Sequence, residues 1–323
     1  MPDSFSKIPI PVILGATGSG KTATAIALAE LLDAEIVSAD SRQIYKELDI
    51  GTAKPTAEER RAVKHHFIDE LEVTEPYNAA QFATDAATRI EAIFSTGKNV
   101  VVAGGSTLYL QGLLQGFSKL PENSPEVREK LYADLAEHGA TALYEKLKAA
   151  DPEHAATLDP TKTQRLIRSL EILEVSSKTV SELKAAEILK PGFHFVPFGL
   201  ALPRERLYEK INLRTDEMFK NGFLEEATRL FEKYAPVMRQ GVKINALATV
   251  GYNELFSFLE GKLSLDEAKN LVKQHTRNYA KRQLTFFRNK FSADWINFAE
   301  TDENALETAK QILMKLKKAN PFC

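Results

Sequence analysis

A glycine-rich segment near the N-terminus combines the residue types and the spacing that bind phosphate groups. Residues 15–22 read GATGSGKT and match the pattern G-x-x-x-x-G-K-[ST]. Glycines allow several backbone N–H groups to point at one anion, the lysine adds a charge, and the threonine hydroxyl can ligate Mg2+. The residues expected to bind a diphosphate-sized anion are Gly15, Ala16, Thr17, Gly18, Ser19, Gly20, Lys21 and Thr22, with Thr22 as the metal ligand. The alternative is a chance match, but the apolar run before the segment and the helical periodicity after it are the context that the pattern requires.

Two polar side chains follow later apolar runs and are candidates for catalysis. Asp40 comes directly after the run at residues 34–39. A carboxylate at a strand end near a phosphate site can accept a proton or hold Mg2+ through water, whereas the alternative is a cap for the next turn. Ser106 follows Gly104 and Gly105, where a close backbone approach would let its hydroxyl donate to a ligand. A simple chain reversal is the alternative there.

A basic and aromatic segment lies near the C-terminus. Residues 270–293 contain no Asp or Glu and interleave basic residues with Tyr and Phe. This composition suits phosphate neutralisation and base stacking, which makes the segment a candidate nucleic-acid site. The alternative is an amphipathic helix with a solvated basic face, although most such faces carry compensating acids. A second cluster, at residues 164–168, places Arg165 and Arg168 on one helix face because they are three residues apart.

The elements that must position these side chains alternate between strand and helix in the first third of the chain. Strands are predicted at residues 10–14, 34–39 and 99–103, and helices at residues 22–32 and 78–94. This alternation indicates parallel βαβ units with right-handed crossovers. Ligands gather at the carboxyl ends of such strands, where the glycine-rich segment, Asp40 and Ser106 all fall.

The sequence pattern changes after the turn-rich residues 121–125. Several amphipathic helices are predicted over residues 126–187, with Asp151-Pro152 and Asp159-Pro160 as helix starts. Beyond them we expect strands at 194–202 and 295–298, and helices at 204–219, 224–234, 246–259, 264–290 and 304–317. The predicted fold is α/β: a P-loop NTPase-like parallel sheet core with a helical insertion domain and additional C-terminal helices. The core is expected at 1–119 and 192–323, the latter part carrying the basic helix, and the insertion at 120–191.

Composition limits the classes of function. The chain has 323 residues and a formal net charge of −2, so a nucleic-acid site must be a local basic patch. Cys323 is the only cysteine, which excludes an intrachain disulfide and a Cys-based zinc site. Residues 1–9 lack a signal-peptide pattern, and no apolar run approaches the ~20 residues of a membrane span. We therefore expect a cytoplasmic protein with no membrane partner.

Several motifs together resemble the tRNA dimethylallyltransferase family, also called tRNA isopentenyltransferases. The matching segments run in family order through nearly the whole chain. They are GATGSGKT at 15–22, SADSRQIY at 38–45, DIGTAKP at 49–55, AGGSTLY at 103–109, PEVR at 125–128, QRLIR at 164–168, VGYNEL at 250–255 and KRQLTFFR at 281–288. The first is shared with many unrelated enzymes, whereas DSRQ with GTAKP, and KRQLTFFR, are far more specific.

The resemblance implies transfer of a dimethylallyl group from dimethylallyl diphosphate to N6 of adenosine 37, the adenosine 3′ of the anticodon in tRNA, with release of diphosphate. It implies Asp40 as general base, and Lys21, Arg214 and Ser106 as further catalytic residues, with Ser106 standing where the family usually has Thr. Mg2+ is the implied cofactor, and we expect a monomer. The residues implied to grip the anticodon stem-loop are Asp40, Ser41, Arg42, Gln43, Arg128, Gln164, Arg165, Leu166, Ile167, Arg168, Lys281, Arg282, Gln283, Leu284, Thr285, Phe286, Phe287 and Arg288.

Three alternative functions remain open at this point. An isopentenyltransferase acting on free adenine nucleotides would need the glycine-rich segment and Asp40 but not the basic segments. A small-molecule P-loop kinase would need ATP and a lid over the γ-phosphate, for which the sequence gives no signal. A non-catalytic RNA-binding module would not need Lys21, Thr22 and Asp40, all of which the chain retains.

Overall fold

In the computed structural model, the protein consists of two compact units. One unit comprises Met1–Leu114 and Pro191–Cys323, and the other Gln115–Lys190, beside the 120–191 expected for the insertion. The structure describes residues 8–118, 120–185, 188–189, 192–297 and 304–319. The predicted strand end at Phe298 and the single cysteine, Cys323, lie outside these residues. Within them, no helix is long and apolar enough to cross a membrane.

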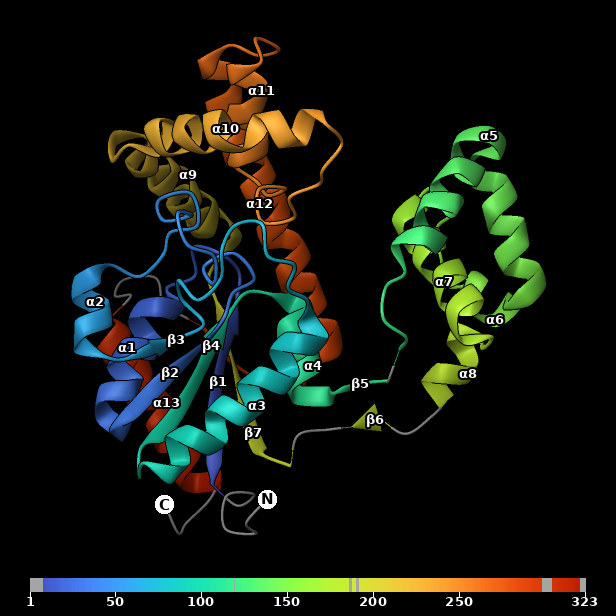
Figure 1. Ribbon diagram of the computed structural model, residues 1–323. Coiled ribbons are helices and arrows are strands. Elements are labelled where there is room, and N and C mark those ends of the chain that lie inside the picture. The colour runs from blue at the N-terminus through green and yellow to red at the C-terminus, as the bar shows by residue number, and fades with distance from the viewer. Residues whose placement is uncertain (1–7, 119, 186–187, 190–191, 298–303, 320–323) are drawn as a thin grey trace. The chain divides into compact units, whose positions relative to one another are not determined.

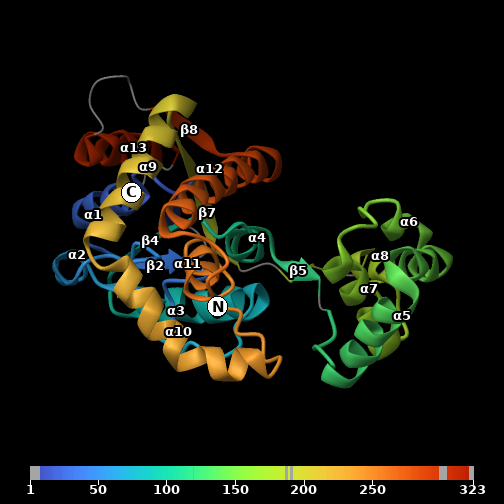
Figure 2. The ribbon, with the colours of Figure 1, turned by 90° about the horizontal axis from the view of Figure 1, so that it is seen from above.

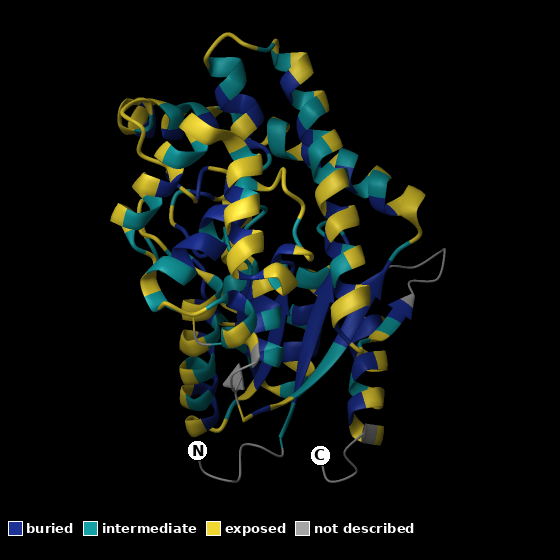
Figure 3. Cartoon of the chain, turned by 90° about the vertical axis from the view of Figure 1, so that its right-hand side faces the viewer, coloured by how far each residue is buried: buried dark blue, intermediate teal, exposed yellow. Residues whose placement is uncertain are grey.

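A six-stranded sheet forms the centre of the larger unit (Figure 1). Its strands lie in the order β3-β2-β4-β1-β7-β8, and every neighbouring pair is parallel. They are β1 (Pro9–Gly15), β2 (Ala34–Ala39), β3 (His65–His66), β4 (Asn99–Gly104), β7 (His194–Ala201) and β8 (Asp294–Asn297). The central strands β1 and β4 are apolar runs because helices cover both faces of the sheet. Every residue of the two strands after the first is buried (Figure 3). The predicted fold class is confirmed.

Helices cover both faces of the sheet, and each face forms its own hydrophobic cluster with them. The helices of this unit are α1 (Lys21–Leu32), α2 (Ala57–Ala62), α3 (Ala79–Ser95), α4 (Thr107–Gln115), α9 (Arg204–Lys220), α10 (Phe223–Arg239), α11 (Tyr252–Leu259), α12 (Leu265–Lys290) and α13 (Ala305–Ala319). Side chains alternate along β1: Ile13 packs with α1 and α13, whereas Val12 and Leu14 pack into the cluster formed by α3, α4, α10, α11 and α12. Figure 2 shows α9 to α12 seen from above the sheet.

Local sequence signals set several helix ends. The Asn78 side chain accepts hydrogen bonds from the N–H groups of Ala80 and Gln81, which fixes the start of α3. The helix predicted from residue 246 begins only at Tyr252, because Gly251 has a φ of 100° and residues 244–250 form turns. The short helix α2 and the two-residue strand β3 were missed, since neither is long enough to show a periodicity.

The smaller unit is a helical bundle. It contains α5 (Pro125–Ala150), α6 (Pro152–Ala155), α7 (Thr163–Ser176) and α8 (Val180–Ala185), and the antiparallel pair β5 (Phe117–Ser118) and β6 (Ile188–Leu189). Leu131, Leu143, Leu166 and Leu170 form part of its core. Asp151 caps α6 as predicted, whereas the same prediction for Asp159 is wrong. The Asp159 carboxylate accepts a hydrogen bond from the Thr161 N–H in a turn, and α7 begins two residues later.

A buried carboxylate organises this bundle. Glu171 is fully buried, accepts hydrogen bonds from the Ser124 N–H at 2.8 Å and the Arg168 guanidinium at 2.7 Å, and lies 3.0 Å from Arg128 Nε. Burial alone would raise the pKa of Glu171, but these partners outweigh it and hold that pKa below its ordinary value. A carboxylate with a depressed pKa stabilises the fold above its unfolded-state pKa, and the contribution is lost as the pH falls.

We expect Glu171→Gln to lower the free energy of unfolding of the bundle by roughly 3 kcal/mol at neutral pH, because two arginines lose their buried anion. The loss should shrink below pH ~4.5, where the wild-type carboxylate itself becomes protonated on unfolding. Urea unfolding at pH 7 and pH 4 measures both values. Glu129→Gln, at an exposed position of α5, is the control. An effect of Glu171→Gln no larger than the control's would contradict this account.

Candidate active site

The glycine-rich loop at residues 15–22 joins β1 to α1 at the carboxyl edge of the sheet. Gly18 and Gly20 have φ values of 81° and 84°, a conformation that side-chain-bearing residues rarely adopt. At Gly15, a Cβ atom would lie 2.7 Å from Ser19 Oγ and 3.0 Å from the Leu200 carbonyl oxygen. The glycine spacing therefore serves a tight loop whose N–H groups lead into the positive end of α1.

Two cationic side chains converge on this loop. Lys21 Nζ donates to the Ala16 carbonyl oxygen at 2.7 Å, and the Arg214 guanidinium from α9 donates to the Thr17 hydroxyl. Burial and the neighbouring Arg214 charge lower the pKa of Lys21 to about 8, while Asp40 acts in the opposite direction. Burial also lowers the pKa of Arg214. Two confined positive charges make this loop suited to bind an anion.

A cavity of about 480 Å3 opens beside the loop. Its lining includes Thr17, Gly18, Gly20, Lys21, Thr22, Asp40, Gly104, Gly105, Lys210 and Arg214. Predicted residues from β1, β2, β4 and α9 therefore share one space, as expected for carboxyl ends of parallel strands. Ala16 and Ser19 belong to the loop but are buried behind this surface.

A second cavity, of about 330 Å3, adjoins the first. Five residues line both: Thr17, Asp40, Thr52, Arg214 and Tyr279. The second cavity also contains Ser41, Arg42, Thr249, Asn253 and Arg282. Thr249 lies outside the motifs quoted above, whereas Thr52 and Asn253 lie within DIGTAKP and VGYNEL without having been assigned a role. Tyr279 stood out only as one aromatic residue of the basic segment, and its position on the shared wall required the fold.

Asp40 lies where β2 ends, on the wall between the two cavities. Its Oδ1 accepts hydrogen bonds from the N–H groups of Arg42 at 2.9 Å and Gln43 at 3.3 Å. No other described residue forms a hydrogen bond with this carboxylate. The capping role and the catalytic role are thus compatible, because one oxygen holds the turn while the group faces both cavities.

The hydroxyl of Ser106 is used inside the protein. It accepts a hydrogen bond from the Ser41 N–H at 2.8 Å and donates to the Ser41 hydroxyl at 3.1 Å. Ser106 is 7% exposed and its backbone N–H donates to the Ala39 carbonyl oxygen. In this structure Ser106 therefore holds the turn that carries Asp40, and it also lines the second cavity.

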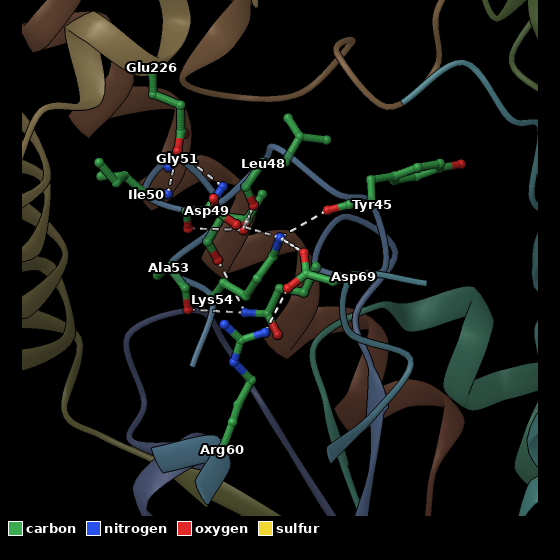
Figure 4. A network of polar contacts seen from close by, with 12 residues as sticks. Tyr45, Leu48, Asp49, Ile50, Gly51, Ala53, Lys54, Arg60, Asp69 and Glu226 are labelled. Carbon is green, nitrogen blue, oxygen red and sulfur yellow. Dashed lines mark hydrogen bonds and ion pairs between the residues drawn. The ribbon is translucent and has the colours of Figure 1, made fainter. Parts of the chain in front are cut away.

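The loop at residues 49–54 is held at both ends by buried charges (Figure 4). At one end, the Glu226 carboxylate from α10 accepts hydrogen bonds from the N–H groups of Asp49, Ile50 and Gly51 and from the Tyr252 hydroxyl. At the other end Lys54, with its side chain 2% exposed, donates to Asp49 Oδ1 at 2.7 Å and pairs with Asp69. Together these contacts fix the wall that carries Thr52. Lys54, the lysine of the DIGTAKP motif, therefore has a structural role.

The side chains of the KRQLTFFR motif on α12 differ in their exposure to solvent. The exposed residues are Lys281, Arg282, Thr285 and Arg288, the half-buried ones are Leu284 and Phe286, and the buried ones are Gln283 and Phe287. The Arg282 guanidinium lies over the Tyr279 ring at 5.8 Å. Phe287 is fully buried in the core, so its ring is not placed to stack on a base.

The tRNA-gripping residues expected in the helical bundle also have different environments. Gln164 and Arg165 are exposed on α7, with Gln164 accepting a hydrogen bond from the Tyr132 hydroxyl at 3.1 Å. Leu166 and Ile167 are core residues, and Arg128 and Arg168 pair with Glu171. The polar members of QRLIR thus split between an exposed edge and an internal ion cluster.

Hard oxygen ligands for a divalent cation lie in the first cavity. Thr22 and Asp40 both line it, and a hydroxyl with a carboxylate is the kind of set that binds Mg2+ when substrate phosphates and water complete the shell. Within the described ranges, no cluster of three or more His, Cys, Asp or Glu side chains could hold a metal. The residues present therefore fit a metal bound jointly with a phosphate ligand.

Comparisons with known proteins find relatives of one family along nearly the whole chain. A model of the family described as IPP transferase matches residues 43–290. A tRNA dimethylallyltransferase of Chlorobium chlorochromatii is 55% identical over 296 residues, covering 91% of this chain and 95% of the relative. The tRNA dimethylallyltransferase of Chlorobaculum parvum is 53% identical over 310 residues, covering 96% and 98%.

Solved structures show the same similarity. A tRNA isopentenylpyrophosphate transferase from Bacillus halodurans is 33% identical, with a TM-score of 0.69 and coverage of 98% of this chain and 99% of that one. A eukaryotic dimethylallyltransferase acting on tRNA is 27% identical, with a TM-score of 0.82 and coverage of 97% and 80%. The match therefore includes both units of the chain.

We expect Glu226→Ala to lower both stability and activity, because four donors lose their acceptor and the Thr52 wall loses its support. The free energy of unfolding should fall by about 3 kcal/mol, the effect of a few half-buried unsatisfied groups. Urea unfolding and the steady-state transferase rate measure the two effects. Glu225→Ala, at the exposed neighbouring position of α10, is the matched control. Equal behaviour of the two variants would contradict the assigned role of Glu226.

Proposed function

The chain belongs to the IPP transferase family, and from that premise we propose how the enzyme uses its two cavities. The first cavity receives dimethylallyl diphosphate, with its diphosphate on the loop at residues 15–22. The second admits the adenine of a tRNA anticodon loop. One observation carries the proposal: Thr17, Asp40 and Arg214 line both cavities, so groups bound on either side meet at the same wall.

The transfer needs a leaving diphosphate to be stabilised and a weak amine to be aligned. The allylic C–O bond breaks and its electron pair leaves with the diphosphate, whose charge Lys21 and Arg214 balance. The N6 amine of adenosine 37 forms the new N–C bond, and its proton passes to the Asp40 carboxylate. Because an exocyclic amine within a stacked loop cannot reach a buried carbon, the base must be extruded into the second cavity.

Mg2+ is the proposed cofactor, held by the Thr22 hydroxyl together with substrate phosphate oxygens. When bound it would neutralise negative charge on the diphosphate. Because the loop cradles a leaving group, no ATP is required by this scheme, which separates it from the kinase alternative.

The residues proposed to contact RNA are exposed residues of α12 in the larger unit and, separately, exposed residues of the helical bundle. On α12 these are Lys281, Arg282, Thr285 and Arg288, and on the bundle Gln164 and Arg165. Their charges suit phosphate contacts, and single-stranded loop bases are the expected target of sequence reading. Free adenine nucleotides would leave both groups of residues unused, so tRNA is the favoured acceptor. We also propose that the enzyme acts as a monomer and works in the cytoplasm, where tRNA is abundant.

The direct test offers dimethylallyl diphosphate and Mg2+ with unmodified tRNA or with AMP in parallel. Mass spectrometry should show a gain of roughly 68 Da on the tRNA and none on AMP, as expected for group transfer to a macromolecular acceptor. Asp40→Asn, which keeps the turn acceptor but loses the base, should lower kcat ~100-fold. Prenylation of AMP alone would favour the free-nucleotide alternative, and ATP turnover without prenylation would favour the kinase.

A second prediction concerns pH. Since the pKa of Lys21 is lowered to about 8, the free protein loses this charge as the pH rises through that value. The affinity for inorganic pyrophosphate should therefore fall between pH 7.5 and pH 9.5, by ~10-fold if one charge contact is lost. Calorimetric titration at fixed ionic strength measures it. Lys21→Arg should flatten the profile, because arginine stays protonated. Parallel pH profiles for the two proteins would argue against this role of Lys21.

A further inference from the structure

Gln283 differs from its neighbours on α12 because it points into the protein. The preceding residues Lys281 and Arg282 are exposed, whereas Gln283 is 2% exposed and shares the inward face with Ala280 and Phe287. A buried amide needs partners for both of its ends, so its contacts reveal what it does.

Both ends of the Gln283 amide form hydrogen bonds with backbone groups at the proposed anion site. Oε1 accepts a hydrogen bond from the Thr17 N–H at 2.9 Å, and Nε2 donates to the Gly105 carbonyl oxygen at 2.7 Å. Thr17 lies in the loop after β1, and Gly105 follows β4, the strand hydrogen-bonded to β1. The amide therefore connects the two turns at the carboxyl edge of the sheet.

The fit is close. A Cβ atom at residue 105 would lie 2.5 Å from Gln283 Nε2, so glycine is required there to admit the amide. The Thr17 N–H is occupied by Gln283, and the Ser19 N–H donates to the Ala16 carbonyl oxygen. The N–H groups left to face an anion must then come from other positions of the loop.

We propose that Gln283 is a positioning residue for the diphosphate site: it fixes the shape of the loop at residues 15–22 from α12, instead of gripping tRNA. This inference rests on the function proposed above. It also assigns two tasks to one helix, since Arg282 of α12 lines the second cavity, Gln283 lines the first, and Tyr279 lines both. Adjacent residues of a single motif would thus serve different substrates.

The test compares Gln283→Met with Gln283→Glu in the full chain. Methionine has a similar volume and removes both hydrogen bonds, whereas glutamate keeps an acceptor for the Thr17 N–H but opposes the Gly105 carbonyl oxygen with a second oxygen. Calorimetry gives the affinity for inorganic pyrophosphate, and filter binding gives the affinity for tRNA. For both variants we expect pyrophosphate affinity and the KM for dimethylallyl diphosphate to worsen by ~10-fold, with tRNA affinity within about twofold of wild type.

Arg282→Ala is the matched control and should show the opposite pattern, with weaker tRNA binding, a shallower salt dependence and unchanged pyrophosphate affinity. Loss of tRNA affinity alone in the Gln283 variants would overturn the inference, and so would unchanged affinity for both ligands. Equal weakening of both affinities with a lower unfolding temperature would also overturn it, since that marks a general structural role. Failure of the wild-type protein to bind pyrophosphate would instead contradict the proposed function.

Discussion

The confinement of two positive charges beside one carboxylate is the constraint on which the structure depends. Lys21 and Arg214 come from α1 and α9 and meet at the loop after β1, with Asp40 nearby. Burial lowers the pKa of both cations, which means that their charged forms are less favourable in the free protein than in water. A bound polyanion would offset the cost of burying these two charges. A leaving diphosphate gains negative charge during the reaction, so the site would stabilise it more than the intact ester.

The scaffold meets this constraint with buried polar contacts at the carboxyl edge of the sheet. Ser106 fixes the turn of Asp40, and Gln283 joins the turns after β1 and β4. Glu226 and Lys54 fix the loop that carries Thr52. The contacts of Ser106 with Ser41, of Gln283 with both turns and of Glu226 with the loop at residues 49–54 join distant parts of the chain, so they are specified by the whole fold. Rigid support of this kind would hold the diphosphate, the Asp40 carboxylate and the amine of the proposed reaction in fixed relative positions.

The sequence predicted the parts of this arrangement that local patterns encode. The loop at residues 15–22, Asp40 at the end of β2 and the long helices follow from glycine spacing and apolar periodicity. The motif did not reveal which side chains of α12 face the core. KRQLTFFR resembles a single RNA-binding segment, yet Gln283 and Phe287 are buried. Glu226 carries no motif, because its partners are backbone N–H groups far away in sequence. The break at Gly251 was missed, since apolar residues on both sides continue a helical pattern.

A crystal structure with dimethylallyl thiodiphosphate, an unreactive substrate analogue, and a tRNA anticodon stem-loop tests the central claim most directly. The account predicts the diphosphate against the loop at residues 15–22, within reach of Lys21 and Arg214. It places the extruded adenine in the second cavity, with N6 within hydrogen-bonding distance of Asp40. A diphosphate bound in the second cavity, or an adenine that enters from the side of the loop, would contradict the account.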